Sequence, residues 1–576
     1  MLKILFRSAR EFKKDFYIAP LFLTGEVIME CIIPLIMASL IDHIQSNDSE
    51  TIIKLGIWLV AAACVSLFCG SMGGVFSSKA ATGFSRNLRH DIFHSIQGFS
   101  FENIDRFSES GLVTRMTTDV TNLQNANLMI LRIALRCPLM IVFSLIGSFF
   151  VNVNITWVFV IIIPFMAAGL LFIIWKTTPI FNRVFRKYDA LNNSVEENIL
   201  GIRVVKSFVR EDFEKEKFNK AAEDVRADFT KAEKILAWNN PLMQFFMYVA
   251  ILVVSYLGSV AIVKSTGVDL STGGLTSLVT FGLQILSSLM MLSMVFGLMT
   301  IASASAKRIV EVLSEKSTII SPANALTKVK DGSVSFKGVS FKYDKDSDKY
   351  TLDGINLDIK AGETLGIIGR TGAAKTSLVS LIPRLYDATK GQVLVGGEDV
   401  RKYDLKTLRD SVAVVLQKNT LFSGTIKDNL RWGNPAATDL EMEKACKLSQ
   451  ADGFIQAFPQ KYDTYIEQGG ANVSGGQKQR ICIARALLKK PRILILDDST
   501  NAVDTKTDAL IRKAFYKEIP NTTKIIISQR ISSIQDADQI VVMKEGRIDA
   551  VGTHEWLLQH NDIYKDIYEF QTRKGA

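Results

Sequence analysis

Long apolar segments alternate with polar segments over the first half of the chain. Each apolar segment is long enough to cross a hydrocarbon core of ~30 Å as a helix that rises ~1.5 Å per residue. The pattern therefore predicts six membrane-spanning helices, near residues 17–41, 53–75, 128–150, 157–175, 242–263 and 275–302.

The polar gaps between these segments differ in length and charge. The gaps at residues 46–51, 152–156 and 265–272 are short and contain no lysine or arginine. The gaps at residues 79–127 and 176–240 are long and rich in both. Because lysine and arginine gather on the cytoplasmic side of a membrane, the asymmetry predicts that the long gaps and both termini are cytoplasmic.

The long gaps also keep a helical pattern. Apolar residues recur at helical spacing among charged ones within residues 198–213 and on either side of them. We therefore expect continuous helices that extend beyond the membrane, with a short turn at each far tip, near residues 103–107 and 208–213.

The second half of the chain has a different pattern. The short apolar run at residues 493–496 predicts a buried strand. Another apolar run ends at Ile367 and Ile368 and leads through a Gly-rich turn into the start of a helix. Strand, turn and helix in this order predict an α/β domain, and the polar residues 321–332 mark its boundary with the first half.

Composition narrows the classes of protein. At 576 residues the chain exceeds one hydrophobic core and should form at least two domains. Its net charge is +10, but the basic residues flank apolar runs instead of forming an Arg-rich stripe. Contact with anionic lipid therefore explains the charge better than nucleic-acid binding. The six cysteines include no CxxC pair, which favours reduced, packed thiols over disulfides or zinc ligands.

The Gly-rich turn carries the first chemical motif. A turn between a strand and a helix N-terminus points backbone N–H groups at an anion. We expect Lys375 to contact the β- and γ-phosphates of a nucleotide and Thr376 to bind Mg²⁺. Ala374 departs from the usual pattern, which has glycine before the lysine. The predicted phosphate loop comprises Gly369, Arg370, Thr371, Gly372, Ala373, Ala374, Lys375, Thr376 and Ser377.

Three further elements follow in order along the chain. Gln417 lies after an apolar run, and Asp497 ends the buried strand, where it can organise Mg²⁺. Between them, a serine and two glycines open a helix and form a second anion cradle. This second motif comprises Ser474, Gly475, Gly476 and Gln477.

With these motifs the chain resembles ABC transporters. Residues 369–376 match the Walker A loop, Gln417 the Q-loop and residues 493–497 the Walker B strand. Residues 473–477 match the signature motif, with valine in place of leucine. The resemblance implies that ATP and Mg²⁺ bind, that Tyr343 stacks on adenine, and that Gln417 joins Thr376 and Asp497 around the metal. It also implies that the tips of the long gaps are coupling helices that dock on nucleotide domains; helices that only cap the bundle are the alternative.

The resemblance also implies the architecture. It is an all-α six-helix transmembrane domain with long cytoplasmic helices, fused to an α/β P-loop nucleotide-binding domain. The implied parts are an interfacial elbow helix at residues 1–15, a transmembrane domain at 16–317, a linker at 318–331 and a nucleotide-binding domain at 332–576. One domain of each kind makes a half-transporter, which must pair.

Two residues depart from the pattern of an active motor. Asp498 stands where such motors have a glutamate base, and Gln529 stands where they have a switch histidine. Aspartate is one methylene shorter, and a misplacement of ~1 Å can slow a reaction ~10²-fold. The chain closely resembles the degenerate-site subunit of bacterial heterodimeric multidrug exporters. That implies a partner half-transporter with both residues intact, a place in the bacterial cell membrane, and export of amphipathic drugs or lipids.

A different class of function fits the same departures. A weak ATPase site also suits an ATP-gated channel or a regulatory membrane subunit. The unbroken signature at residues 474–477 favours the exporter, because a gate does not need a site competent for turnover.

The membrane half carries few charged residues within its spans. Glu26 and Glu30 share one face of the first span, and Arg132 and Arg136 share a face near the start of the third. Ionisable groups are costly there and face a cavity or a partner charge. In the functional interpretation, the two glutamates contact cationic cargo or take part in a proton-linked step. In the structural interpretation, serine hydroxyls or a cationic neighbour satisfy them.

Overall fold

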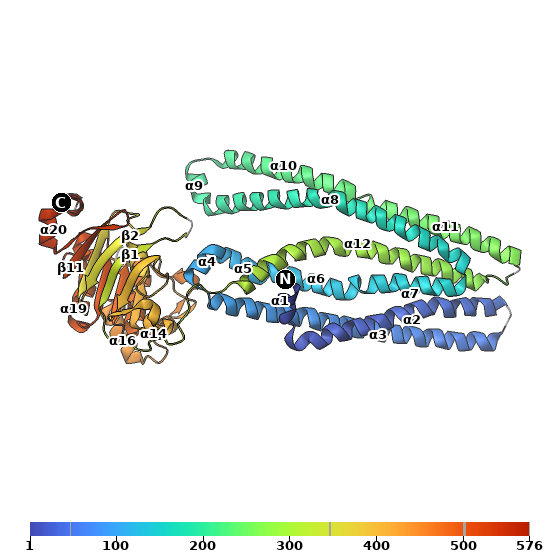
Figure 1. The fold of residues 1–576 in the computed structure, drawn as a ribbon, viewed down its shortest axis with the longest axis horizontal. Helices are drawn as coiled ribbons and strands as arrows, with labels where there is room; N and C mark the ends of the chain where they lie inside the picture. Colours follow the sequence, from blue (N-terminus) through green and yellow to red (C-terminus); the bar gives the residue numbers. More distant parts are fainter. Residues whose placement is uncertain (46–47, 266, 345–346, 499–502, 575–576) are drawn as a thin grey trace. The chain divides into compact units, whose positions relative to one another are not determined.

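The computed structural model describes residues 1–45, 48–265, 267–344, 347–498 and 503–574 (Figure 1). The chain divides into two compact units. The first comprises Met1–Gln97 and Glu109–Glu315, and the second comprises Gly98–Ser108 and Lys316–Ala576. The boundaries expected at residues 1–15 and 318–331 remain predictions.

The first unit is helical. It contains α1 (Leu2–Arg7), η1 (Arg10–Phe12), α2 (Lys13–Gln45), α3 (Ser49–Gln97), α5 (Glu109–Thr114), η2 (Arg115–Asp119), α6 (Val120–Met129), η3 (Ile130–Ala134), α7 (Arg136–Val151), α8 (Val153–Leu200), α9 (Ile202–Ser207), α10 (Glu211–Leu236), α11 (Asn239–Ser265) and α12 (Thr272–Ser314). Among the described residues, six helical segments are long and apolar enough to cross a membrane, and each overlaps one of the predicted spans.

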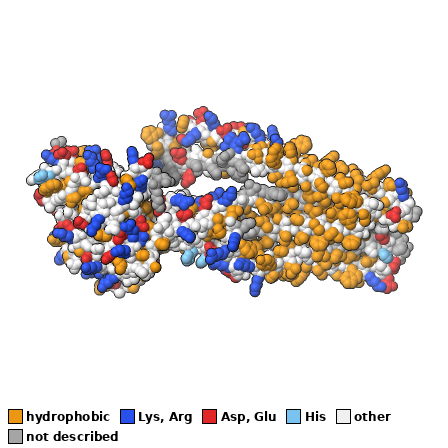
Figure 2. All heavy atoms as spheres, in the orientation of Figure 1, with side chains coloured by type: hydrophobic (Ala, Val, Ile, Leu, Met, Phe, Trp, Pro, Cys, Tyr) orange, Lys and Arg blue, Asp and Glu red, His pale blue; other side chains and the backbone are white. Residues whose placement is uncertain are grey.

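The spanning helices continue well past their apolar parts. Figure 2 shows a broad band of hydrophobic side chains on the helical unit, with most of the charged side chains on the long part to one side of this band. The charged extensions of α8 and α10 pack against each other, as the helical spacing in the long gaps predicts. The short α9 forms the far tip of the second gap, slightly earlier in the chain than expected.

A buried carboxylate joins two of these extensions. Asp119, at the end of the π-helical segment η2, is fully buried. It accepts hydrogen bonds from Ser305 Oγ at 2.8 Å and from Arg308 Nε at 2.8 Å, both on α12. A buried charge that is paired and hydrogen-bonded in this way fixes the register of the two helices.

The second unit is built on parallel strands. Its strands are β1 (Val334–Phe341), β2 (Leu352–Ile359), β3 (Thr364–Gly369), β4 (Lys390–Val395), β5 (Glu398–Asp399), β6 (Val412–Val415), β7 (Gly424–Thr425), β8 (Tyr465–Ile466), β9 (Ile493–Asp497), β10 (Thr523–Ile527), β11 (Gln539–Lys544) and β12 (Arg547–Gly552). The main sheet has the order β12-β11-β3-β10-β9-β6, with β12 the antiparallel edge. A smaller antiparallel sheet has the order β2-β1-β4-β5.

The second unit also contains helices. They are α4 (Phe101–Phe107), α13 (Lys375–Ser380), η4 (Val400–Lys402), α14 (Leu405–Ser411), α15 (Ile426–Arg431), α16 (Asp439–Leu448), α17 (Asp452–Ala457), η5 (Lys461–Asp463), η6 (Gln468–Gly470), α18 (Gly475–Leu488), α19 (Thr505–Glu518), η7 (Ile531–Ser533), α20 (His554–His560) and α21 (Asp562–Lys574).

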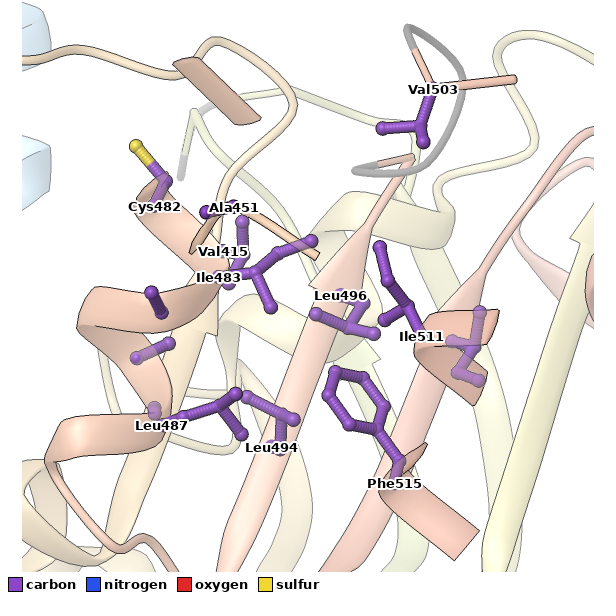
Figure 3. Packing of buried hydrophobic residues seen from close by; sticks show 14 of the residues in the cluster. Val415, Ala451, Cys482, Ile483, Leu487, Leu494, Leu496, Val503, Ile511 and Phe515 are labelled. Atoms are coloured by element: carbon purple, nitrogen blue, oxygen red, sulfur yellow. The ribbon is translucent and has the colours of Figure 1, made fainter. Parts of the chain in front are cut away.

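Successive side chains of β9 enter different cores. Leu494 and Leu496 pack with Ile511 and Phe515 of α19 (Figure 3). Ile493 and Ile495 belong to the core on the opposite face of the sheet. A parallel strand covered on both faces is apolar throughout, which explains why residues 493–496 form a continuous apolar run.

The sheet order determines where chemistry can occur. Strands β6, β9, β10, β3 and β11 are parallel, so their carboxyl ends share one edge. Ligands of open α/β sheets bind at that edge. The predicted phosphate loop follows β3, Asp497 ends β9 and Gln529 follows β10, so the fold brings these three parts of the sequence to one place.

Candidate functional site

The phosphate loop connects β3 to α13 in a tight turn. A Cβ atom at Gly369 would overlap the carbonyl oxygen of Met543 on β11, so only glycine fits there. Gly372 has a φ of +85°, in the left-handed region that glycine favours. Ala374, directly before α13, is also left-handed, with φ +66°. The residue that departs from the usual pattern therefore stands at a position whose backbone favours glycine.

Lys375 is buried at the start of α13. Its ammonium donates hydrogen bonds to the carbonyl oxygens of Gly369 at 2.9 Å and Arg370 at 3.2 Å, which closes the loop on itself. Burial lowers the pKa of Lys375, and the carboxylates of Asp498 and Asp497 oppose that shift. The lysine is thus held at the centre of the loop, next to two acidic side chains.

Thr376 and Asp497 meet at the expected metal position. The Thr376 hydroxyl donates a hydrogen bond to the Asp497 carboxylate, which is buried. Burial raises the pKa of Asp497, and the hydrogen bond from Thr376 opposes the rise. A hydroxyl beside a carboxylate is a pair of hard oxygen ligands that fits Mg²⁺. Gln417 lies exposed two residues beyond β6 and makes no hydrogen bond within the described part of the chain.

The two departures from the motor pattern contact each other. Gln529 Nε2 donates a hydrogen bond to Asp498 Oδ2 at 3.2 Å. Asp498 Oδ1 is buried and has no partner among the described residues. The backbone of Asp498 is left-handed, with φ +47°, and its N–H bonds to the carbonyl oxygen of Ile527 at 3.0 Å. The base position and the switch position therefore form one hydrogen-bonded pair.

The C-terminal helix braces the switch position. Gln571 of α21 donates from Nε2 to the carbonyl oxygen of Gln529 at 2.7 Å and accepts from the N–H of Ile531 at 3.0 Å. Both contacts are to backbone atoms on either side of Arg530. Sequence reasoning missed Gln571, because it lies far along the chain in an amphipathic helix with no motif.

Tyr343 lies beside the phosphate loop, as the adenine-stacking role requires. Its hydroxyl shares a hydrogen bond with Ser377 Oγ at 2.9 Å. Its ring packs edge-on against Phe341 and Tyr386, yet the residue is 47% exposed. The residue is therefore accessible to a base, and stacking remains a prediction.

The tip of the first long gap packs on this unit. Asp105 of α4 accepts a hydrogen bond from the Tyr386 hydroxyl at 2.6 Å, and the rings of Phe101 and Tyr386 are 6.1 Å apart. Burial, together with the bond to Asp105, raises the pKa of Tyr386. The docking expected near residues 103–107 is thus seen within the second unit, and Tyr386, which carried no sequence motif, is its anchor.

The signature residues form the capped start of α18. Ser474 Oγ accepts from the N–H of Gln477 at 3.3 Å, and Gln477 Oε1 accepts from the N–H of Ser474 at 2.9 Å. Ser474 and Gly475 are exposed. Within the described ranges, no hydrogen bond links this motif to the phosphate loop of its own chain. The motif is therefore available for contact with another molecule.

The two glutamates of the first span meet an arginine. Arg136 Nη2 donates to both carboxylate oxygens of Glu30, at 2.6 and 2.7 Å, and lies 3.6 Å from Glu26 Oε1. This geometry favours the alternative in which a cationic neighbour satisfies both residues.

Comparisons with known proteins agree with the geometry. The family model for the ABC transporter transmembrane region matches residues 16–290, and the model for the ABC transporter domain matches residues 352–501. The chain is 34% identical over 561 residues to YfiB of Bacillus subtilis, an uncharacterised ABC transporter ATP-binding protein, with 97% of each chain covered. It is 32% identical over 510 residues to an ATP-dependent lipid A-core flippase of Aromatoleum aromaticum, covering 88% of this chain and 83% of the relative.

A solved structure shares the whole fold. The structure of a bacterial Atm1-family ABC exporter with ATP bound superposes with a TM-score of 0.83. It covers 98% of this chain and 99% of its own, at 23% sequence identity. The predicted fold class, six apolar helices joined to an α/β nucleotide-binding domain, is confirmed.

Proposed function

Because the chain belongs to the ABC transporter family and is an exporter half-transporter by fold, we propose that it is one subunit of a heterodimeric exporter. The exporter would use ATP to move amphipathic drugs or lipids out of the cell. The proposed place is the bacterial cell membrane, with the nucleotide-binding domain and both termini in the cytoplasm. The lysine- and arginine-rich long gaps support that orientation. The resemblance to lipid A-core flippases supports a lipid-like cargo.

The hydrogen bond between Asp498 and Gln529 carries the proposal. A base that activates water must present a free carboxylate oxygen to it. Here Oδ2 of Asp498 is engaged by the Gln529 amide, Oδ1 is buried, and the side chain is one methylene shorter than glutamate. An amide also cannot exchange a proton with a phosphate as an imidazole can. We therefore expect slow hydrolysis at this site.

The same site keeps the groups needed for binding. Mg²⁺, when bound, would neutralise charge on the phosphates. Lys375 is held in the loop for the phosphates, Thr376 and Asp497 offer oxygen ligands, and Tyr343 is exposed beside the loop. Binding without efficient hydrolysis means that ATP should stay at this site through several cycles of a second site.

The second site would lie on the partner. The exposed, capped start of α18 offers its backbone N–H groups to an anion that the partner's phosphate loop holds. An ATP-gated channel or regulatory subunit is the alternative, and the complete signature motif favours the exporter.

The test is ATP hydrolysis by the purified chain alone. We expect bound ATP but turnover far below that of a typical transporter, because every site that the chain forms with itself contains Asp498 and Gln529. The double variant Asp498→Glu, Gln529→His should raise the single-turnover rate about 10²-fold, since it restores both reach and proton exchange.

Lys375→Ala serves as the control that removes nucleotide binding. Transporter-like turnover by the unmodified lone chain, abolished by Lys375→Ala, would contradict the heterodimer. So would a double variant that binds ATP normally and hydrolyses it no faster.

A further inference from the structure

A cavity of about 540 Å³ lies among the helices of the first unit. Two basic residues, Arg132 and Arg136, and one acidic residue, Glu26, line it, together with Ser66, Gly70 and Ser71 of α3. We propose that this cavity binds the phosphate or carboxylate headgroup of an anionic amphiphile, with Arg132 as its principal contact. Such a ligand is opposite in charge to the cationic cargo considered for Glu26 and Glu30 from sequence.

The acidic side chains near the cavity are already engaged. Glu30 receives two hydrogen bonds from Arg136 Nη2, and Glu26 lies within 3.6 Å of the same nitrogen. A cationic ligand would have to displace Arg136 from Glu30 or share Glu26 with it. The Arg136–Glu30 pair is partly buried, and displacing Arg136 from it would leave a charge without its partner, so that exchange is unfavourable.

The basic side chains keep unused donors. Arg132 has no carboxylate within 4.0 Å in the described part of the chain. Arg136 Nε is buried and has no hydrogen-bond partner among the described residues. A guanidinium stays charged and presents five N–H donors in a fork that matches phosphate and carboxylate oxygens. An arginine within a span is costly without an anion, and a ligand headgroup would supply one.

The backbone at Arg132 is itself unusual. Arg132 lies in η3, a π-helical segment between α6 and α7. Single π-helical turns are rare within α-helices, and those that occur often lie at functional sites. They direct side chains to positions that a regular helix would not reach. The segment brings Arg132 and Ile133 to the cavity wall.

The shape of the cavity suits a headgroup with a tail. A Cβ at Gly70 would lie 3.0 Å from the Glu26 carboxylate, so this glycine of α3 lets Glu26 lie close to the helix at the cavity wall. Long apolar side chains complete the wall for an acyl chain: Leu23, Leu67, Leu128, Met129, Ile133 and Met291. Met291 is 52% exposed.

The experiment measures ligand binding by native mass spectrometry of the full-length chain in neutral detergent, without ATP. The probes are dodecyl phosphate, dodecyltrimethylammonium with the same tail and opposite charge, and inorganic phosphate. We expect dodecyl phosphate to bind most tightly and Arg132→Gln to weaken it about tenfold, because a charge-assisted hydrogen bond is lost. The matched control Lys264→Gln removes one positive charge from α11 outside the cavity and should leave the affinity unchanged.

A second cavity variant tests the proposal independently, in case Arg132→Gln fails to fold. Met291→Glu places a carboxylate at an exposed position of the same wall and should also weaken dodecyl phosphate. Tighter binding of the cationic probe would overturn the proposal. Unchanged binding of dodecyl phosphate to both cavity variants would overturn it too. Binding of inorganic phosphate as tight as that of dodecyl phosphate would overturn the assignment of the ligand as an amphiphile.

Bilayer lipid and cargo are two sources of the same chemistry. In phosphatidylcholine nanodiscs with added phosphatidylglycerol, loss of dodecyl phosphate binding would identify the anionic lipid as the occupant. Retained binding would identify a cargo amphiphile. Only the step from binding to transport rests on the proposed function. Binding is measured without nucleotide, so failure of the ATP hydrolysis test and failure of this one are separate results.

Discussion

Ala374 adopts a left-handed backbone conformation where the phosphate loop meets α13. A residue with a Cβ pays about 1 kcal/mol or more for that conformation, whereas glycine adopts it freely. We expect Ala374→Gly to raise the melting temperature of the full-length chain and to tighten ATP binding severalfold. Thermal unfolding with and without an ATP analogue measures both effects.

Ala373 provides the matched control. It is buried next to Ala374, and its φ is not positive. Ala373→Gly should therefore lower the melting temperature, since it adds flexibility and removes buried surface. If both substitutions shift stability in the same direction, the strain at residue 374 is not what limits the loop.

Motif residues could be predicted from sequence because they lie at the ends of strands. Lys375 follows β3 and Asp497 ends β9, so a parallel sheet brings them together in any chain with this order. Gln571 and Tyr386 could not be predicted in this way. Each contacts a segment far away in sequence, through an ordinary side chain with no local pattern.

Helix α4 contacts the aromatic side chain of Tyr386, in addition to the hydrogen bonds that Ser100 and Asn103 make with residues 316 and 318. Tyr386→Phe would remove the hydrogen bond to Asp105 and keep the ring contact with Phe101. Loss of a bond worth about 1 kcal/mol should speed amide hydrogen exchange in α4 about fivefold. Hydrogen-exchange mass spectrometry of the full chain measures the change.

Tyr462→Phe is the control for that measurement. It removes a similar tyrosine–aspartate bond, to Asp452 at 2.8 Å, elsewhere in the second unit. Exchange in α4 should stay as in the unmodified chain. Equal exchange of α4 in the two variants would show that the Asp105 bond does not hold the helix.

Helix α16 begins with a charge-dependent cap. Glu441 accepts from the N–H of Thr438 and pairs with Lys490 at 2.7 Å, and these contacts lower its pKa to about 2. Because its pKa is lowered, the ionised carboxylate stabilises the fold at pH values above its ordinary pKa of 4.5. This stabilisation is lost as the pH falls toward 2. We expect Glu441→Gln to lower the melting temperature at pH 7.

The pH dependence separates the cap from simple charge removal. The difference in melting temperature between Glu441→Gln and the unmodified chain should shrink as the pH falls below 4.5. Glu443→Gln, which removes the same charge from an i,i+4 pair with Lys447, should have a smaller effect at pH 7. A difference in melting temperature that stays constant with pH would contradict the assignment of a charge-dependent cap to Glu441.

Elements with periodic patterns were predictable, and irregular ones were not. The six spans follow from length and hydropathy alone. The π-helical turns at η2 and η3 interrupt helices whose sequences look continuous, and no residue pattern marks them. The charged residues of the candidate cavity, Glu26, Arg132 and Arg136, could be named from the sequence, but their arrangement beside η3 could not.

At the scale of the whole transporter, the proposal makes the two ATP sites unequal. Gly475→Asp would place a carboxylate at the exposed start of α18, against the phosphates held by the partner. This repulsion should lower turnover of the complex about 10²-fold. Asp498→Asn alters only the slow site and should change turnover less than about threefold. Phosphate release by the purified complex ranks the two.

The reverse ranking would place hydrolysis at this chain's own phosphate loop. Identification of the trapped nucleotide would then show ADP in the site of Lys375. Under the proposal, that site holds intact ATP while the partner's site turns over.

The long helices of the first unit differ in mechanical stiffness. Helix α3 runs for 49 residues without a proline, whereas α8, with 48 residues, contains Pro164 and Pro179. An uninterrupted helix of that length is a rod of about 74 Å, and a 5° tilt of it moves the far end by about 6 Å. A proline removes one rung of the hydrogen-bond ladder and lets a rod bend there. Helix α3 therefore has no proline joint along its length, whereas α8 has two points at which it can bend and absorb such a displacement.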